Sequence, residues 1–166
     1  IDVTSELYRN YTRPETANNY ADLHQNNHRS KSGAAMATAA VVLAEYAPEP
    51  AIDPDGSRDP LAWWDYGTTQ VDEALRFILV TGDGAYSEGP HYQRFTTETM
   101  APFFGMWDRV LGSAGWTTAD GRVIPAIHTT AQFGLTQDWM LDLTLPDGTL
   151  APIDDANTHE AYYFGA

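Results

Sequence analysis

The chain turns and then enters an aromatic helix within one stretch, Asp83-Gly84-Ala85-Tyr86-Ser87-Glu88-Gly89-Pro90-His91-Tyr92-Gln93-Arg94-Phe95. Two glycines and a proline make its first half a turn-rich loop. Apolar and aromatic residues recur at helical spacing beyond it, which predicts a helix. The stretch also gathers two tyrosines, a histidine, an arginine and two acidic residues. A segment that only had to turn would not need so many groups able to move or stabilise a proton.

Helical patterns lie on both sides of this loop. Upstream, Asp59-Pro60 supplies an N-cap followed by proline at the first helical position, and the helix is predicted to end near Thr81-Gly82. Downstream, a helix is predicted over His91–Leu111, with Pro102 inside it.

The remaining segments are also mostly helical in pattern. Residues 4–24 predict a short helix, a kink at Pro14 and a second helix, and the tail from Thr158 predicts the start of another. Proline-rich Ala47–Pro60 is predicted to be a surface loop. Helices are further predicted over Ser30–Glu45 and over residues 126–145, and Ser113–Pro125 is predicted to be a loop with a turn at Ala119-Asp120-Gly121.

These patterns predict an all-α architecture in which helical hairpins form an arc of an (α/α) toroid. Four or five helices would not close such a ring. We therefore expect residues 1–166 to be a single α-helical domain or fragment, the N-terminal part of a larger catalytic unit.

Composition excludes several classes of protein. The chain has 166 residues and a net charge of −14, which argues against nucleic-acid binding because that needs a basic surface. No run of about 18 apolar residues is present, so no membrane span is predicted. The chain contains no cysteine, which excludes disulfides and thiolate zinc sites.

A second polar segment, Asn26-Asn27-His28-Arg29, lies upstream at the start of another apolar helix. Three of the nine Lys and Arg residues flank the two polar segments, namely Arg29, Lys31 and Arg94. A local positive pocket can exist on an acidic protein, because salt screens exposed charges beyond roughly 8–10 Å.

The two segments together resemble the heparinase II/III-like polysaccharide lyases, and most closely their alginate and oligoalginate lyase branch. The resemblance covers about Asn26 to Asp155. It is strongest in the loop from Glu88 to Tyr92. It also includes Asn27-His28 upstream and Pro146-Asp147-Gly148 with Asp154-Asp155 downstream.

This resemblance implies an (α/α) toroid followed by a C-terminal antiparallel β-sheet domain in the full-length protein. It also implies an enzyme that cleaves an acidic polysaccharide, alginate or a glycosaminoglycan, by β-elimination. We expect no cofactor or metal, and a periplasmic or secreted bacterial location. The chain from His28 to Tyr92 is slightly longer than is usual in the family, and the loop Pro48–Asp59 can absorb the difference.

Carried over residue by residue, the resemblance makes Asn27 and His28 the pair that contacts the uronate carboxylate, and Tyr92 the residue that moves protons. The chemistry requires such groups. The proton beside a uronate carboxylate is barely acidic while the carboxylate stays negative, so hydrogen-bond donors must neutralise it. Tyrosine has a reference pKa of about 10, so cationic or donor groups such as His28 and Arg94 must stabilise its phenolate.

The other candidate residues are predicted to bind substrate, each with a structural alternative. Tyr86 can pack or stack on a sugar, and Glu88 can bind a sugar hydroxyl or fix its own loop. His91 points away from Tyr92 if both residues begin a helix. Arg94 is a candidate for the substrate or the phenolate, and Asn27 can also act as the N-cap of the Ser30–Glu45 helix.

Two rival functions remain open at this point. A glycoside hydrolase on an α toroid would pair Asp83 or Glu88 with Asp154 or Asp155. A non-catalytic sugar-binding helical module would instead bind oligosaccharide without turnover, through Trp63, Trp64, Tyr86 and Trp107.

Overall fold

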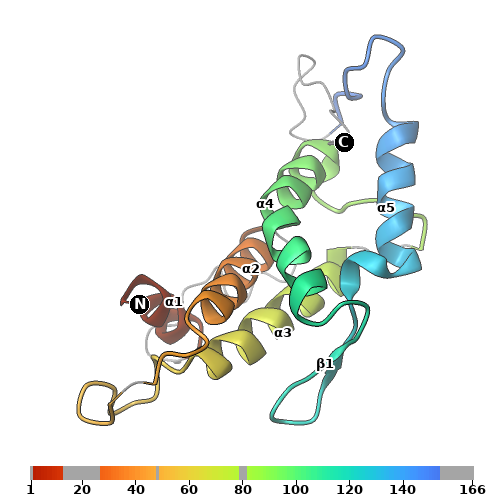
Figure 1. Ribbon diagram of the computed structural model, residues 1–166. Coiled ribbons are helices and arrows are strands. Elements are labelled where there is room, and N and C mark those ends of the chain that lie inside the picture. The colour runs from red at the N-terminus through yellow and green to blue at the C-terminus, as the bar shows by residue number, and fades with distance from the viewer. Residues whose placement is uncertain (1, 13–26, 48, 79–81, 154–166) are drawn as a thin grey trace.

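Figure 1 shows the computed structural model of the chain, in which helices predominate. The structure describes residues 2–12, 27–47, 49–78 and 82–153. Within these ranges the elements are α1 (Asp2–Thr12), α2 (Asn27–Val42), α3 (Pro60–Ile78), α4 (Gly89–Val110), β1 (Trp116–Thr117), β2 (Val123–Ile124), the short 3-10 helix η1 (Ile127–Thr129) and α5 (Ala131–Asp142). The predicted all-α class is confirmed, with one short hairpin added to it.

The helices α2 and α3 lie side by side and run antiparallel (Figure 1). They cross at two glycines. A Cβ atom on Gly33 would lie 2.6 Å from the Gly67 carbonyl oxygen, and one on Gly67 would lie 2.6 Å from the Gly33 carbonyl oxygen. No side chain fits at either position, so backbone packs on backbone and the two glycines set the spacing of the pair.

An aromatic cluster joins this pair to α4 and to the hairpin. The ring of Trp64 on α3 stacks on Trp107 of α4 with centroids 5.6 Å apart. Trp64 also makes a T-shaped contact with Trp116 of β1, with ring centroids 5.9 Å apart. Phe103 contacts both Trp64 and Trp107. Paired aromatic rings stabilise a core beyond their buried area by roughly 0.5–1.5 kcal/mol each.

The prediction that Ser113–Pro125 is only a loop is wrong, because β1 and β2 pair antiparallel within it. The predicted turn at Ala119-Asp120-Gly121 forms the tip of this hairpin, with Gly121 at φ 85°. Asp65 of α3 holds the hairpin: its carboxylate accepts from the Trp116 indole N–H at 2.6 Å and from the Ala119 backbone N–H at 2.7 Å.

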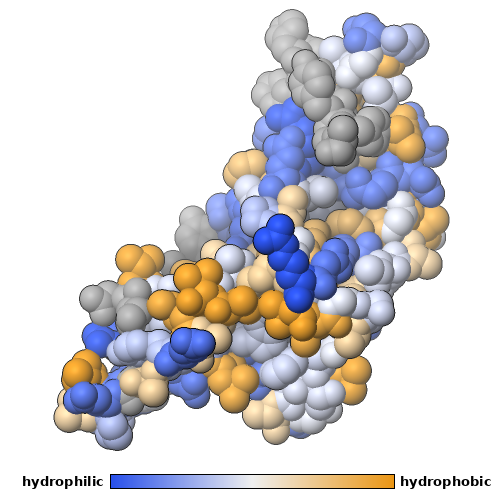
Figure 2. Space-filling model, viewed as in Figure 1, coloured by the Kyte–Doolittle hydropathy of each residue, from blue (hydrophilic) through white to orange (hydrophobic). Residues whose placement is uncertain are grey.

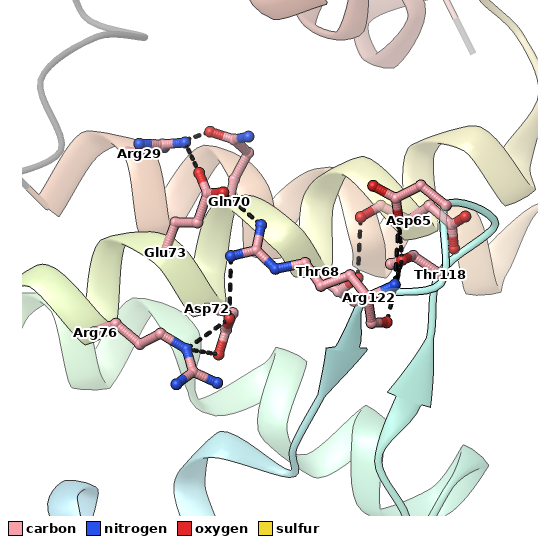
Figure 3. A network of polar contacts seen from close by, with 10 residues as sticks. Arg29, Asp65, Thr68, Gln70, Asp72, Glu73, Arg76, Thr118 and Arg122 are labelled. Atoms are coloured by element: carbon pink, nitrogen blue, oxygen red, sulfur yellow. Dashed lines mark hydrogen bonds and ion pairs between the residues drawn. The ribbon is translucent and has the colours of Figure 1, made fainter.

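A polar network extends this attachment along α3 (Figure 3). Arg122 of the hairpin pairs with Glu73 and lies 3.7 Å from Asp72. Glu73 also pairs with Arg29 of α2, whose Nε donates to Gln70. The network therefore links α2, α3 and the hairpin. Arg29 is buried and is part of this packing, so it does not supply the substrate-facing cation that its position in the sequence suggested.

The start of α3 agrees with the prediction. The Asp59 carboxylate accepts a hydrogen bond from the Leu61 backbone N–H at 2.9 Å, and Pro60 is the first helical residue. Within the described residues α3 runs to Ile78, and Thr81 of the predicted end at Thr81-Gly82 lies outside them. At the next helix, α4 begins at Gly89, two residues before the predicted start.

The predicted helix over residues 126–145 is wrong at both ends. Thr130 adopts an extended conformation (ψ 148°) after the short η1, and its side chain accepts from the Phe133 backbone N–H. This cap starts α5 at Ala131, and α5 ends at Asp142. Beyond it, Thr144 and Leu150 form an isolated antiparallel bridge on either side of Pro146-Asp147-Gly148.

Three predicted features lie outside the described residues, namely the second helix of residues 4–24, Asp154 with Asp155, and the tail from Thr158. Among the described helices, none is both long and apolar enough to cross a membrane.

Candidate functional site

The structure brings the two polar segments of the sequence together. Asn27 begins α2, and Glu88 stands immediately before α4. The Asn27 backbone N–H donates to Glu88 Oε2 at 2.6 Å, and its side-chain Nδ2 donates to Glu88 Oε1 at 3.3 Å. Residues 61 positions apart in the sequence thus form a two-point contact, and the N-termini of α2 and α4 lie next to each other.

This contact corrects the predicted N-cap. Asn27 lies inside α2 rather than before it, because the helix starts three residues earlier than expected. The carboxylate of Glu88 accepts from the helix's first backbone N–H instead, where a negative charge also complements the helix dipole. Of the two roles considered for Glu88, fixing the loop is the one for which the structure shows contacts.

We expect Glu88→Ala to lower the free energy of unfolding by about 1–2 kcal/mol, because the α2 terminus and the Asn27 amide lose a charged acceptor. Urea denaturation measures this change. Glu98→Ala is the matched control: Glu98 is exposed on α4, lies 3.6 Å from Arg94 and should change stability by no more than about 0.5 kcal/mol. Equal losses in the two variants would show that Glu88 does not cap α2.

The loop before α4 is also anchored on α5. Gly84 has φ 84°, and a Cβ atom there would lie 2.0 Å from the Leu135 carbonyl oxygen. The Thr136 hydroxyl donates to the Gly84 carbonyl oxygen at 2.6 Å. The loop between Asp83 and Glu88 is thus held at one end by α5 and at the other by α2.

Tyr86 lies in the core rather than at a surface. It is 4% exposed, and its hydroxyl shares a hydrogen bond of 2.8 Å with the Thr96 hydroxyl on α4. Burial raises the pKa of the Tyr86 phenol well above its usual value, although the hydrogen bond with Thr96 opposes the shift. Of the two roles predicted for Tyr86, packing fits this position and stacking on a sugar does not.

The raised pKa predicts a dependence of stability on alkaline pH. The unfolded chain loses the Tyr86 proton near pH 10, whereas the folded chain holds it to higher pH. Stability due to Tyr86 is therefore complete below about pH 10 and falls as the pH rises above it, by up to about 1.4 kcal/mol per pH unit. Urea denaturation of wild type and Tyr86→Phe above pH 10 should show a shallower decline in the variant. Parallel declines would contradict the shift.

The other predicted residues lie on the first turns of the two helices. His28 is exposed on α2, whereas His91 and Tyr92 on α4 are half-buried. The rings of His91 and Tyr92 meet edge to face with centroids 5.0 Å apart. The prediction that His91 points away from Tyr92 is therefore wrong. Arg94 is also half-buried, and its Nε lies 3.6 Å from Glu98 on the next turn.

Lys31 and Phe95 are in contact across α2 and α4, which the sequence did not predict. The Lys31 ammonium lies 4.0 Å from the centroid of the Phe95 ring. Lys31 is one turn beyond His28 and Phe95 is one turn beyond Tyr92, so the pair adjoins the predicted site. In the sequence, Lys31 follows His28 by three residues and Phe95 follows Tyr92 by three residues. The contact itself could not be predicted, because it depends on how α2 and α4 are aligned along each other.

The aromatic residues of the sugar-binding alternative are not available at the surface. Trp63, Trp64, Tyr86 and Trp107 are all buried, and the Trp63 indole N–H donates to the Ser57 carbonyl oxygen at 2.7 Å. That alternative, as far as it depends on these four rings, is wrong.

Within the described ranges, no group of three or more His, Asp or Glu residues is arranged to hold a metal ion. Comparison of the chain with protein-family models, curated proteins and solved structures finds no match.

Proposed function

We propose that the chain is the helical part of a polysaccharide lyase that cleaves a uronic-acid polysaccharide by β-elimination. The observation that carries the proposal is the pair of hydrogen bonds between Asn27 and Glu88. They join the two segments on which the resemblance to heparinase II/III-like lyases rests. We further propose that α2 and α3 belong to an arc of an (α/α) toroid, completed by more helices and a C-terminal β-sheet domain in a larger exported protein.

In the proposed reaction, Tyr92 as a phenolate takes the proton from the carbon beside the uronate carboxylate. The electron pair of that bond forms a carbon–carbon double bond, and the glycosidic oxygen leaves. The leaving oxygen needs a proton, which Tyr92 returns if both events occur on one face of the sugar. Otherwise His28 protonates the leaving oxygen from the opposite side.

The burial of Asn27 bears on which of the two residues, Asn27 or His28, contacts the uronate carboxylate. Asn27 is 2% exposed and one of its amide hydrogens is directed to Glu88. For the case in which Tyr92 also protonates the leaving oxygen, we therefore assign the direct contact with the uronate carboxylate to His28, which is exposed one residue later. Asn27 holds the α2 terminus in place, and the partial positive charge of that terminus favours a nearby carboxylate.

The hydrolase alternative has less support from the same residues. Both carboxylate oxygens of Glu88 accept from Asn27, and Asp83 Oδ1 accepts from the Ala85 backbone N–H at 2.9 Å. Their proposed partners, Asp154 and Asp155, lie outside the described residues.

Product analysis separates the two reactions. The protein is incubated with alginate, polygalacturonate, a glycosaminoglycan and a neutral glucan. A lyase creates a double bond conjugated to a carboxylate, so ultraviolet absorbance should rise together with new reducing ends on at least one uronate polymer and not on the glucan. New reducing ends without absorbance would indicate a hydrolase, and neither signal on any uronate polymer would contradict the proposal.

A further inference from the structure

The chain contains a single lysine, Lys31, in a protein of net charge −14. It stands on the second turn of α2, and its ammonium lies over the ring of Phe95, which is 40% exposed on α4. The contact is a cation–π interaction that holds the ammonium at the boundary between the two helices. Within the described part of the chain, Lys31 forms no ion pair, and Glu88 is the acidic group that acts on it through charge.

The pair lies in a groove that α2 and α4 line together with Thr4 of α1. The groove has a volume of about 820 Å³, and its lining includes Lys31, Phe95, Ala34, Ala35, Thr38 and Thr99. Beyond Lys31, α2 carries no charged residue, and apolar surface gathers over this helix in Figure 2. Small and aromatic apolar side chains with a few polar groups are the usual lining of a ligand site, and the C–H faces of a sugar ring pack well on them.

The position of the pair relates it to the proposed reaction centre. Lys31 is three residues beyond His28, and Phe95 is three residues beyond Tyr92. One turn of an α-helix advances about 5.4 Å, which is close to the length of one sugar residue in a polysaccharide chain. A sugar next to the one at Tyr92 would therefore reach Lys31 and Phe95 if the polymer runs along the groove.

The charge of Lys31 suits a carboxylate. Burial lowers the pKa of the Lys31 ammonium, and the charge of Glu88 opposes that shift. A partly desolvated cation gains more from a charged hydrogen-bond partner than one fully in water. On a chain with so few cations, this single ammonium in the groove gives an anionic sugar a point of attachment that a neutral sugar lacks.

We propose that Lys31 and Phe95 form a second uronate subsite, in which Lys31 binds the carboxylate of the sugar next to the one at Tyr92 and Phe95 packs on its ring. The inference rests on the proposed function and specifies its substrate as a polymer with uronates in consecutive positions.

A single lysine allows a direct test by NMR. Reductive methylation with ¹³C-formaldehyde labels Lys31 and the N-terminal amine, and the signal missing from Lys31→Arg identifies Lys31. The labelled Tyr92→Phe protein is titrated with a uronate trisaccharide, a uronate monosaccharide and a neutral trisaccharide. We expect the Lys31 signal to shift and saturate with the uronate trisaccharide, to respond more weakly to the monosaccharide, and to stay unchanged with the neutral sugar.

Kinetics on the unlabelled protein give a second readout. Lys31→Gln should raise KM for a uronate polymer about tenfold with little change in kcat, because it removes one charged contact. Lys31→Arg should keep most of the affinity. Arg109→Gln, an equal charge change at the exposed far end of α4, should leave KM within about twofold.

The outcomes separate the inference from the proposed function. Cleavage of uronate polymers with an unresponsive Lys31 signal and an unchanged KM in Lys31→Gln would overturn the subsite and leave the lyase proposal standing. A saturating Lys31 signal without cleavage by wild type would support the subsite and overturn the lyase. An absence of both would overturn both.

Discussion

Replacing Tyr92 with phenylalanine is expected to reduce uronate cleavage about a thousandfold while the protein stays folded. The change removes one oxygen, the atom that takes the proton in the proposed elimination. Loss of a positioned acid–base group typically costs about 10²–10⁴-fold in rate. The fold should tolerate the change because the Tyr92 ring packs against the core. In the part of the chain that the structure describes, no group hydrogen-bonds to its hydroxyl, so none is left unpaired.

Tyr86→Phe is the matched control for this experiment. It removes a hydroxyl six residues away that bonds to Thr96 inside the protein. We expect it to lose about 1 kcal/mol of stability and to keep cleavage within a few-fold of wild type. The two variants should thus affect different properties, rate for Tyr92 and stability for Tyr86. Near-normal turnover in Tyr92→Phe would remove Tyr92 from the mechanism.

The second large effect is structural. Gly67→Ala is expected to destabilise the fold by about 2–3 kcal/mol, because the new methyl group would lie 2.6 Å from the Gly33 carbonyl oxygen and 2.8 Å from the Ala37 backbone nitrogen. Both obstacles are backbone atoms, so the helices must move apart. Overpacking of this kind typically costs about 1–3 kcal/mol, and here the cost must exceed the roughly 1 kcal/mol that alanine gains over glycine in a helix.

Gly105→Ala separates the clash from helix propensity. Gly105 lies inside α4, and a Cβ atom there meets nothing within 4 Å. That substitution should stabilise the protein by about 0.5–1 kcal/mol. Thermal unfolding of the three proteins should therefore place wild type between the two variants. If the melting temperature of Gly67→Ala equals or exceeds that of wild type, α2 and α3 do not cross as closely as the structure shows.

The ends of a helix could be predicted from the sequence where a capping residue or a proline marks them. Asp59-Pro60 predicted the start of α3 because capping depends on a few adjacent residues. The start of the helix predicted over residues 126–145 was wrong because Thr130, near the beginning of the apolar pattern, caps α5 and so sets its first residue at Ala131.

The hairpin could not be read from the sequence for a different reason. Each strand has two residues, too few to show an alternating pattern. Its partners, Asp65 and Glu73, lie on α3 about 50 residues earlier. Only the tertiary fold reveals that Arg122 and Trp116 contact them.

The contact between the two polar segments could be anticipated only at the level of segments, because the individual hydrogen bonds depend on the fold. The resemblance singled out both Asn27-His28 and the loop from Glu88 to Tyr92, and the structure joins these segments. That Glu88 would cap α2 required knowledge of how α2 and α4 pack. The burial of Tyr86 was equally hidden, since its place in a polar, turn-rich loop suggested exposure. The contact between Lys31 and Phe95 likewise could not be predicted, because it depends on the packing of α2 against α4.

A crystal structure of the Tyr92→Phe protein with a bound uronate trisaccharide tests the central claim most directly. The account predicts a sugar with its carboxylate within hydrogen-bond distance of His28 and the carbon beside that carboxylate facing the ring at position 92. The neighbouring uronate should contact Lys31. A trisaccharide bound away from the N-termini of α2 and α4, or with His28 and position 92 on different sides of the molecule, would contradict the claim.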